Sequence, residues 1–296
     1  MELGRVSTAM VTPFSSTGEI DYDKTEKLIE HLIANGSDSL VVCGTTGESP
    51  TLSVEEKESL FSFTVKAVNK RVPVIAGTGT FSTKETVKLT RMAEQAGADG
   101  IMLVAPYYNK PDQKGMYAHF SLVAGETSLP VMLYNIPGRS AVNMLPETLI
   151  ALSKIPNIRA VKEASGSLDQ MVDIISGTDN GFSVYSGDDA LALPTLAIGG
   201  KGIVSVASHV AGNEMQQMIA AFKEGRTEQA GAMHRALLPL FRSIFSAPNP
   251  VMVKYALEKR GVQTGGVRLP LIGMNAKDEA FDKVWENYEK NLHIFN

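Results

Sequence analysis

The chain has 296 residues, of which 44% are hydrophobic and 20% are charged. This composition is typical of a soluble globular protein with one large α/β domain or two ordinary ones. The formal net charge of −4 gives no electrostatic footprint for nucleic acid, and no apolar run approaches the roughly 20 residues that span a membrane.

The single cysteine, Cys43, excludes an intrachain disulfide and indicates a reducing compartment. The segment from Met1 to Met10 lacks the basic stretch and apolar core of a signal peptide. We therefore expect a cytoplasmic protein. The histidines are scattered and Cys43 has no partner cysteine, so the spacing of metal ligands is absent and we expect no metal site.

Eight short runs rich in Val, Ile and Leu predict eight strands. Most of them are continuously apolar, which is typical of parallel strands covered on both faces. The runs are 6–11, 39–43, 72–76, 100–104, 131–134, 158–161, 182–185 and 202–206.

Helical patterns lie between these runs. Two of the predicted helices begin at serine N-caps, Ser53 and Ser82, each with a glutamate (Glu56 and Glu85) three residues later, which is the spacing of a capping box. The other predicted helices between the strands are 23–34, 116–126, 145–153, 168–176 and 190–198.

This alternation predicts a (β/α)₈ TIM barrel. The alternative, a doubly wound open sheet, lacks its Gly-x-Gly-x-x-Gly turn after the first strand, and the glycines of Gly77-Thr-Gly79 suit an ordinary tight turn. After about Asn213 only helical patterns follow, at 214–223, 227–245, 250–260 and 278–291. We expect a barrel over residues 1–224 and a C-terminal helical extension over residues 225–296.

Lys162 is the first candidate for chemistry, because it follows the apolar run 158–161. Lysine is almost never fully buried without a partner, and burial in an apolar barrel favours its neutral amine. A neutral amine can attack a carbonyl and form a Schiff base. The alternative is a lysine whose amine extends from a strand end into solvent.

Other candidates follow the predicted strands, because TIM-barrel sites lie at the carboxyl ends of the strands. Thr45 and Thr46, between Gly44 and Gly47, offer hydroxyl and amide groups to a carboxylate or a proton relay; the alternative is an ordinary turn. The adjacent Tyr107 and Tyr108 cannot both point the same way and also suit a subunit interface.

Tyr134 and Arg139 follow the fifth strand, and alternation places Tyr134 beside Lys162 as a proton shuttle or a barrel-lining aromatic residue. Arg139 is a candidate for binding the carboxylate of a substrate, and the alternative is an ordinary surface arginine. Gly187 allows a ligand to approach the backbone closely. Asp188-Asp189 is predicted as a helix cap rather than a catalytic dyad, Lys201 falls at the wrong end of the barrel, and Asn249-Pro250 suits a helix start.

Taken together, these residues resemble the dihydrodipicolinate synthase family, also called the 4-hydroxy-tetrahydrodipicolinate synthase family, within the pyruvate-dependent class I aldolase superfamily. The resemblance covers essentially the whole chain. The matching motifs are Gly44-Thr-Thr-Gly-Glu48, Pro106-Tyr-Tyr-Asn109, Tyr134-Asn-Ile-Pro-Gly-Arg139, Val161-Lys162 and Ser186-Gly-Asp188. The resemblance implies a lyase that needs no cofactor and condenses pyruvate with aspartate-semialdehyde through a lysine Schiff base, on the diaminopimelate route of lysine biosynthesis. It also implies a homotetramer built as a dimer of dimers.

The resemblance also implies roles for single residues. Lys162 is the Schiff-base lysine, Tyr134 and Thr45 move protons, and Tyr108 completes the relay from a neighbouring subunit while Tyr107 packs at the dimer interface. The residues expected to contact substrate are Thr46 and the backbone of Val204 for pyruvate, Arg139 for the carboxylate of the aldehyde, and Gly187.

Two alternatives and one departure from the family accompany this assignment. N-acetylneuraminate lyase and 2-keto-3-deoxy-sugar acid aldolases share the lysine and tyrosine, and a non-catalytic keto-acid sensor could share the barrel. Where lysine-inhibited members place two histidines and an asparagine, this chain has Val54, Lys57 and Phe81. We expect an enzyme that is insensitive to lysine.

Overall fold

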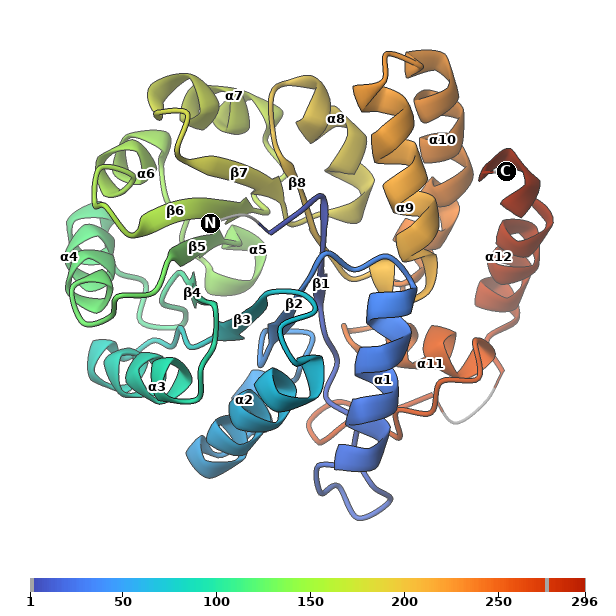
Figure 1. Ribbon diagram of the computed structural model, residues 1–296, viewed down its shortest axis with the longest axis horizontal. Helices are drawn as coiled ribbons and strands as arrows, with labels where there is room; N and C mark the ends of the chain where they lie inside the picture. Colours follow the sequence, from blue (N-terminus) through green and yellow to red (C-terminus); the bar gives the residue numbers. More distant parts are fainter. Residues whose placement is uncertain (1–2, 275–276, 296) are drawn as a thin grey trace.

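The computed structural model describes residues 3–274 and 277–295, and its centre is a closed barrel of eight parallel strands in the order β1 to β8 (Figure 1). This confirms the predicted TIM barrel. The strands are β1 (Val6–Ala9), β2 (Ser39–Val42), β3 (Val74–Gly77), β4 (Gly100–Val104), β5 (Val131–Asn135), β6 (Ile158–Glu163), β7 (Ser183–Ser186) and β8 (Gly202–Ser205).

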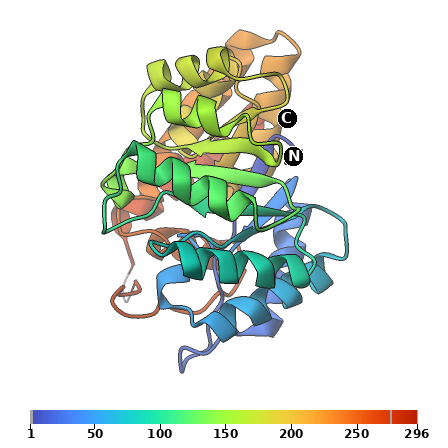
Figure 2. The same cartoon turned by 90° about the vertical axis from the view of Figure 1, so that its left-hand side faces the viewer.

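Helices surround the barrel and cover its outer face, as the second view shows for α3, α4 and α6 (Figure 2). They are α1 (Tyr22–Ala34), α2 (Val54–Val68), α3 (Thr83–Gln95), α4 (Gln113–Ala124), α5 (Pro137–Ser140), α6 (Pro146–Leu152), α7 (Leu168–Gly177), α8 (Ala192–Ala197) and α9 (Ser208–Lys223). Short 3₁₀ turns are η1 (Ser49–Thr51), η2 (Asp189–Leu191) and η3 (Leu292–Phe295).

The serine caps explain where two helices begin. Ser53 Oγ accepts a hydrogen bond from the Glu56 amide, and the Glu56 carboxylate accepts one from the Ser53 amide at 2.8 Å. This is the predicted capping box, which satisfies two of the free amides of the first turn of α2. Ser82 caps α3 through the amide of Glu85.

Successive side chains of each strand point alternately outward and inward, so the protein has two hydrophobic cores. The outward side chains pack against the helices, while a smaller cluster fills the inside of the barrel. The buried members of this inner cluster are Leu3, Ala9, Val41, Ile75, Met102, Met132, Tyr134, Ala160, Tyr185 and Val204. The inside of the barrel is therefore an apolar, desolvated environment for any polar group that enters it.

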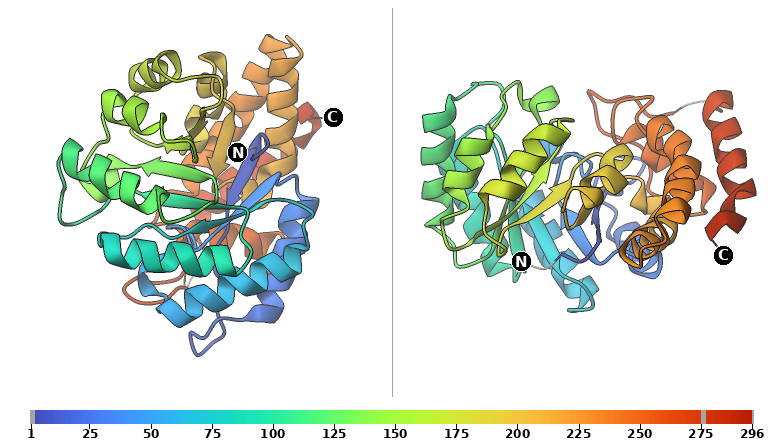
Figure 3. Two further views of the ribbon diagram at one scale, coloured as in Figure 1. Left: turned by 60° about the vertical axis from the view of Figure 1, so that its left-hand side comes forward. Right: turned by 90° about the horizontal axis from the view of Figure 1, so that it is seen from above.

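Three further helices follow the barrel: α10 (Thr227–Ser243), α11 (Val251–Lys259) and α12 (Glu279–Lys290). Helix α10 packs against α9, and α12 lies outside α10 at the edge of the molecule (Figure 3). The predicted boundary between residues 224 and 225 falls in the turn between α9 and α10. Within the described residues, no helix combines the length and apolar character that a membrane crossing needs.

Several bounds differ from the prediction by a few residues, as for β1, which ends at Ala9 rather than at residue 11, and two differences bear on the site. Strand β6 continues through Lys162 to Glu163, so the lysine lies within the strand rather than directly after it. The four-residue helix α5 was not predicted, because one turn is too short to show a helical period. Ser140 closes this turn by donating to the carbonyl of Ile136 at 2.9 Å.

Candidate active site

Lys162 and Tyr134 form the centre of the candidate site. They are register partners on β6 and β5, and the Lys162 amine lies 4.2 Å from the centroid of the Tyr134 ring. Both are buried, with 5% and 4% of their surfaces exposed. The alternation of strand residues thus places an amine beside a phenol in the apolar inside of the barrel.

Burial decides the protonation of both groups. It lowers the pKa of Lys162 to about 8, against the opposing charge of Asp189, while the Arg139 guanidinium adds to the lowering. About one amine in ten is then neutral at pH 7, compared with about one in a few thousand at an ordinary pKa. Burial raises the pKa of Tyr134 to about 12, although the charge of Arg139 and a hydrogen bond from Thr45 oppose the rise.

The next residue on each strand points to the outer face and fixes the strand ends. Asn135 and Glu163 are register partners, and both are completely buried. The Glu163 carboxylate accepts hydrogen bonds from Asn135 Nδ2 and Gln170 Nε2, each at 3.0 Å, and from the Ser165 amide at 2.6 Å. These bonds connect β5, β6 and α7 directly behind Lys162 and Tyr134.

The turn after β2 brings two threonines to the same end of the barrel. Thr45 lines the pocket and hydrogen-bonds Tyr134, whereas Thr46 is buried. Cys43 also lines the pocket, but burial raises the pKa of its thiol to about 12, so it stays protonated and is a poor nucleophile.

Gly77, the last residue of β3, and Gly79, two residues later, let the end of this strand pack closely against its neighbours. A Cβ atom at Gly77 would lie 2.6 Å from the Cys43 carbonyl oxygen, and one at Gly79 would lie 2.4 Å from the Val104 amide nitrogen. The structure does not form the tight turn that we expected at Gly77-Thr-Gly79, because the Thr78 amide continues the pairing with β4 by donating to the Met102 carbonyl oxygen at 3.1 Å. The two glycines instead let this segment lie close to Cys43 on one side and to Val104 on the other.

The pocket has a volume of about 200 Å³ and lies over the ends of β2 to β5. It is lined by Cys43, Gly44, Thr45, Ser49, Pro50, Gly77, Gly79, Met102, Val104, Tyr107, Tyr134, Ile136, Arg139 and Ser140. Arg139 is exposed and stands in α5. Among the residues that the structure describes, no carboxylate forms an ion pair with Arg139, so its guanidinium can bind an incoming carboxylate.

The turn after β7 contains a glycine that faces the lysine. A Cβ atom at Gly187 would lie 3.1 Å from both Cγ and Cε of Lys162 and 2.8 Å from the Ala164 side chain. Gly187 thus leaves room for the lysine side chain. Its predicted contact with substrate stays a prediction.

The two aspartates that follow Gly187 have different roles. Asp188 caps η2 through the amide of Ala190, as predicted. Asp189 does not cap this helix: its carboxylate accepts hydrogen bonds from Ser205 Oγ and from the amides of Val206 and Ala207, which hold the end of β8. The cap prediction is therefore correct for Asp188 and wrong for Asp189.

The remaining candidate residues lie in different parts of the structure. Tyr107 lines the pocket and packs edge-to-face against Phe81, with ring centroids 5.5 Å apart. Tyr108 points away, with 92% of its surface exposed and a left-handed backbone at φ +73°. Val204 lies in the inner core beside β1. Lys201 precedes β8 at the opposite end of the barrel, as predicted.

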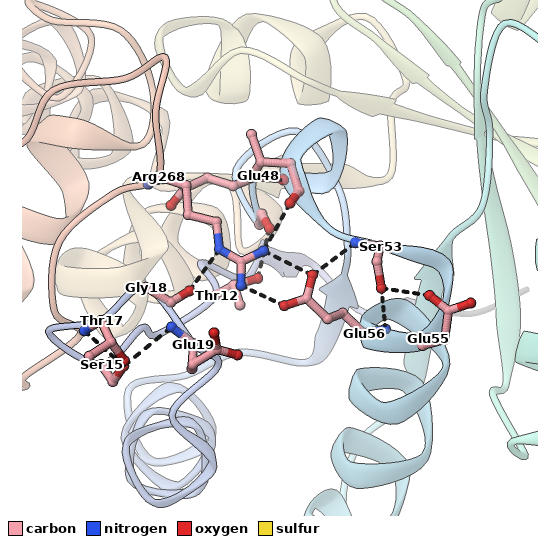
Figure 4. A network of polar contacts seen from close by, with 12 residues as sticks. Thr12, Ser15, Thr17, Gly18, Glu19, Glu48, Ser53, Glu55, Glu56 and Arg268 are labelled. Carbon is pink, nitrogen blue, oxygen red and sulfur yellow. Dashed lines mark hydrogen bonds and ion pairs between the residues drawn. The ribbon is translucent and has the colours of Figure 1, made fainter.

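Sequence reasoning missed how closely the C-terminal segment contacts the site. Glu48, the last residue of the Gly44–Glu48 motif, accepts from the Lys254 amine at 2.8 Å and from the Arg268 amide at 2.9 Å. Figure 4 shows Arg268 between Glu48 and Glu56, with its side chain also bonded to the carbonyl oxygen of Gly18. No local pattern connects residues more than 200 positions apart, so only the fold reveals these contacts.

Comparisons with known proteins show which family the chain is similar to. Residues 2–285 match the model of the Dihydrodipicolinate synthetase family. The chain is 60% identical over 275 residues to a 4-hydroxy-tetrahydrodipicolinate synthase of Bacillus velezensis, covering 93% of this chain and 95% of the relative.

Solved structures give the same result. A dihydrodipicolinate synthase of Bacillus anthracis is similar with a TM-score of 0.94 and 52% identity over 98% of both chains. A chloride-inhibited dihydrodipicolinate synthase of Acinetobacter baumannii, solved in complex with pyruvate, has a TM-score of 0.90 and 36% identity over 99% of both chains.

Proposed function

The chain belongs to the dihydrodipicolinate synthetase family, and on this premise we propose that it condenses pyruvate with L-aspartate-4-semialdehyde to give 4-hydroxy-tetrahydrodipicolinate. The observation that carries the proposal is the buried Lys162 amine beside the Tyr134 phenol. A relative that is similar over almost the whole chain is named for this activity. One of the similar solved structures is a complex with pyruvate.

Lys162 is proposed as the nucleophile. Its neutral amine attacks the ketone carbon of pyruvate, and loss of water leaves an imine between Lys162 Nζ and that carbon. Loss of a proton from the methyl group of pyruvate then gives an enamine, whose terminal carbon attacks the aldehyde carbon of the second substrate. The new carbon–carbon bond leaves an alkoxide that takes up a proton and becomes the hydroxyl group of the product. The amino group of the second substrate then attacks the imine carbon, which closes the ring, breaks the bond to Lys162 Nζ and returns the lysine as a free amine.

Tyr134 and Thr45 are proposed to move these protons. The raised pKa of Tyr134 keeps the phenol protonated at neutral pH, so it can donate to the oxygen that leaves as water. Thr45 hydrogen-bonds the phenol and lines the pocket, which places a second hydroxyl on a route toward the mouth. Arg139 is proposed to bind the carboxylate of aspartate-semialdehyde, and Thr46 and the Val204 backbone to bind pyruvate.

Tyr108 is proposed to complete the relay of a neighbouring subunit, in a homotetramer built as a dimer of dimers. The support is its position: within its own chain Tyr108 follows a pocket-lining residue but is itself 92% exposed. A tyrosine in that position can reach a site in a second copy. This use of Tyr108 requires at least a dimer.

An assay with the purified protein tests the proposal. Pyruvate and aspartate-semialdehyde together should give product, and omitting either substrate should abolish it. Cleavage of N-acetylneuraminate or of a 2-keto-3-deoxy-sugar acid, without condensation of these two substrates, would assign the chain to another aldolase activity. Binding of pyruvate without any turnover would indicate a keto-acid sensor.

A further inference from the structure

The connection between α10 and α11 contacts the turn after β2, next to the pocket-lining residue Thr45. Asn249 stands in this connection and is buried, with 8% of its surface exposed. Its Nδ2 donates a hydrogen bond to Thr46 Oγ1 at 2.9 Å, across 203 positions of the sequence. The sequence suggested only a helix start here, and α11 does begin just afterwards at Val251.

This hydrogen bond determines what the Thr46 hydroxyl can do. A hydroxyl group has one hydrogen to donate, and an amide NH₂ can only donate. Because Thr46 Oγ1 accepts from Asn249, its own hydrogen is free for another acceptor. A carboxylate accepts hydrogen bonds and does not donate them, so it is a suitable partner for that hydrogen.

Polar contacts hold the helix that follows Asn249 against the rest of the chain. In the helix that follows it, the Lys254 amine donates to Glu48 Oε1 at 2.8 Å and to the carbonyl oxygens of Thr12 and Gly266 at 2.8 and 2.7 Å. Glu48 closes the same turn that carries Thr46. The segment from Asn249 to Lys254 thus contacts this turn at two points, one of them a buried ion pair.

We propose that Asn249 is a positioning residue that turns the Thr46 hydroxyl hydrogen toward the carboxylate of pyruvate. The C-terminal segment then contributes to substrate binding through a residue that need not touch substrate. This inference rests on the proposed function, since it takes pyruvate as the ligand of Thr46.

The test compares two substitutions that separate hydrogen-bond direction from packing. Asn249→Asp is nearly isosteric, but its carboxylate accepts and draws the Thr46 hydrogen away from pyruvate. Asn249→Ala leaves the hydroxyl free to rotate. Because a hydrogen bond to a charged group is lost, we expect Asn249→Asp to raise KM for pyruvate at least about tenfold, and Asn249→Ala to raise it less.

The same interaction should be held in the ground state and the transition state, so kcat should change by less than about threefold. The pyruvate concentration that gives half-maximal borohydride trapping should rise in parallel with KM. In a Thr46→Val background, Asn249→Asp should add no more than about a twofold further change, since the group through which it acts is gone.

Tyr255→Phe is the matched control, because it removes a hydrogen bond to Asp282 within the C-terminal segment and leaves the threonine turn untouched. It should keep the KM of the unmodified protein. An unchanged KM in Asn249→Asp, or a full effect of that substitution in the Thr46→Val background, would overturn the inference. If the unmodified protein itself fails to condense the two substrates, the proposed function fails instead.

Discussion

Tyr134 and Lys162 lie side by side in register on β5 and β6, with the lysine amine 4.2 Å from the centre of the tyrosine ring. Burial moves their pKa values in opposite directions, to about 12 for the phenol and about 8 for the amine. Both shifts favour the neutral form. At neutral pH the phenol therefore keeps a proton to donate while a useful fraction of the amine can attack a carbonyl.

Replacing Arg139 by alanine should damage the use of the second substrate. Arg139 lines the pocket beyond Tyr134, and losing a charge-assisted hydrogen bond costs about 1.5–3 kcal/mol, or roughly 10- to 150-fold in kcat/KM for aspartate-semialdehyde. Trapping of the pyruvate imine should largely survive in Arg139→Ala. Equal loss of both functions would indicate a structural arginine.

Removing the buried cation at Lys254 should lower stability. Lys254 and Glu48 form an ion pair with 4% and 1% of their side chains exposed, and breaking such a pair by removing one partner costs about 3–5 kcal/mol in the free energy of unfolding. Lys254→Met should show this loss in denaturant titration. Lys24→Met, which removes a more exposed ion pair with Asp21, should cost about 1 kcal/mol or less. Similar losses in the two variants would contradict this account of the buried pair.

Subunits that are inactive alone should complement each other if Tyr108 acts in a neighbouring site. Tyr108→Phe lacks the relay and Lys162→Ala lacks the nucleophile. In a mixed dimer, one site receives its lysine from the first chain and its tyrosine from the second, so activity should reappear after subunit exchange. Complete exchange, shown by native mass spectrometry, without any recovery would place Tyr108 outside the neighbour's mechanism.

The protein should be insensitive to lysine. At the positions where inhibited relatives are expected to bind lysine, Val54 offers no hydrogen bond and Lys57 adds a like charge. Phe81, 53% exposed, fills space beside Tyr107. Three losses of about 1 kcal/mol or more, with added repulsion, predict at least a hundredfold weaker affinity. Initial rates at subsaturating pyruvate should stay constant with lysine up to concentrations on the order of millimolar, and partial inhibition below that range would refute the expectation.

The barrel was predictable because its signals are local and repeated. Eight apolar runs of strand length alternate with helical patterns, and caps such as Ser53-Glu56 fix where helices begin. The proximity of Tyr134 and Lys162 was also predictable from the sequence, because period-two alternation on neighbouring strands determines which residues share a face.

Other parts of the site depend on contacts that no local pattern encodes. Asn249 reaches Thr46 and Lys254 reaches Glu48 only after the chain has closed the barrel and folded back. Asp189 looked like part of a helix cap because its neighbour Asp188 is one, but its buried carboxylate is used by the end of β8 instead. The exposure of Tyr108 likewise follows from the turn geometry after β4.

The most direct measurement is mass-spectrometric mapping of the adduct that forms when pyruvate is added and aliquots are quenched with borohydride at several pH values. We predict one reduced adduct per chain on Lys162. Its rate of formation should rise about tenfold per pH unit below pH 8 and level off above it, because the lowered pKa of about 8 sets the neutral fraction of the amine. An adduct on another lysine, such as Lys201 or Lys110, or a rate that keeps rising toward pH 10, would contradict the assignment of Lys162 as the desolvated nucleophile.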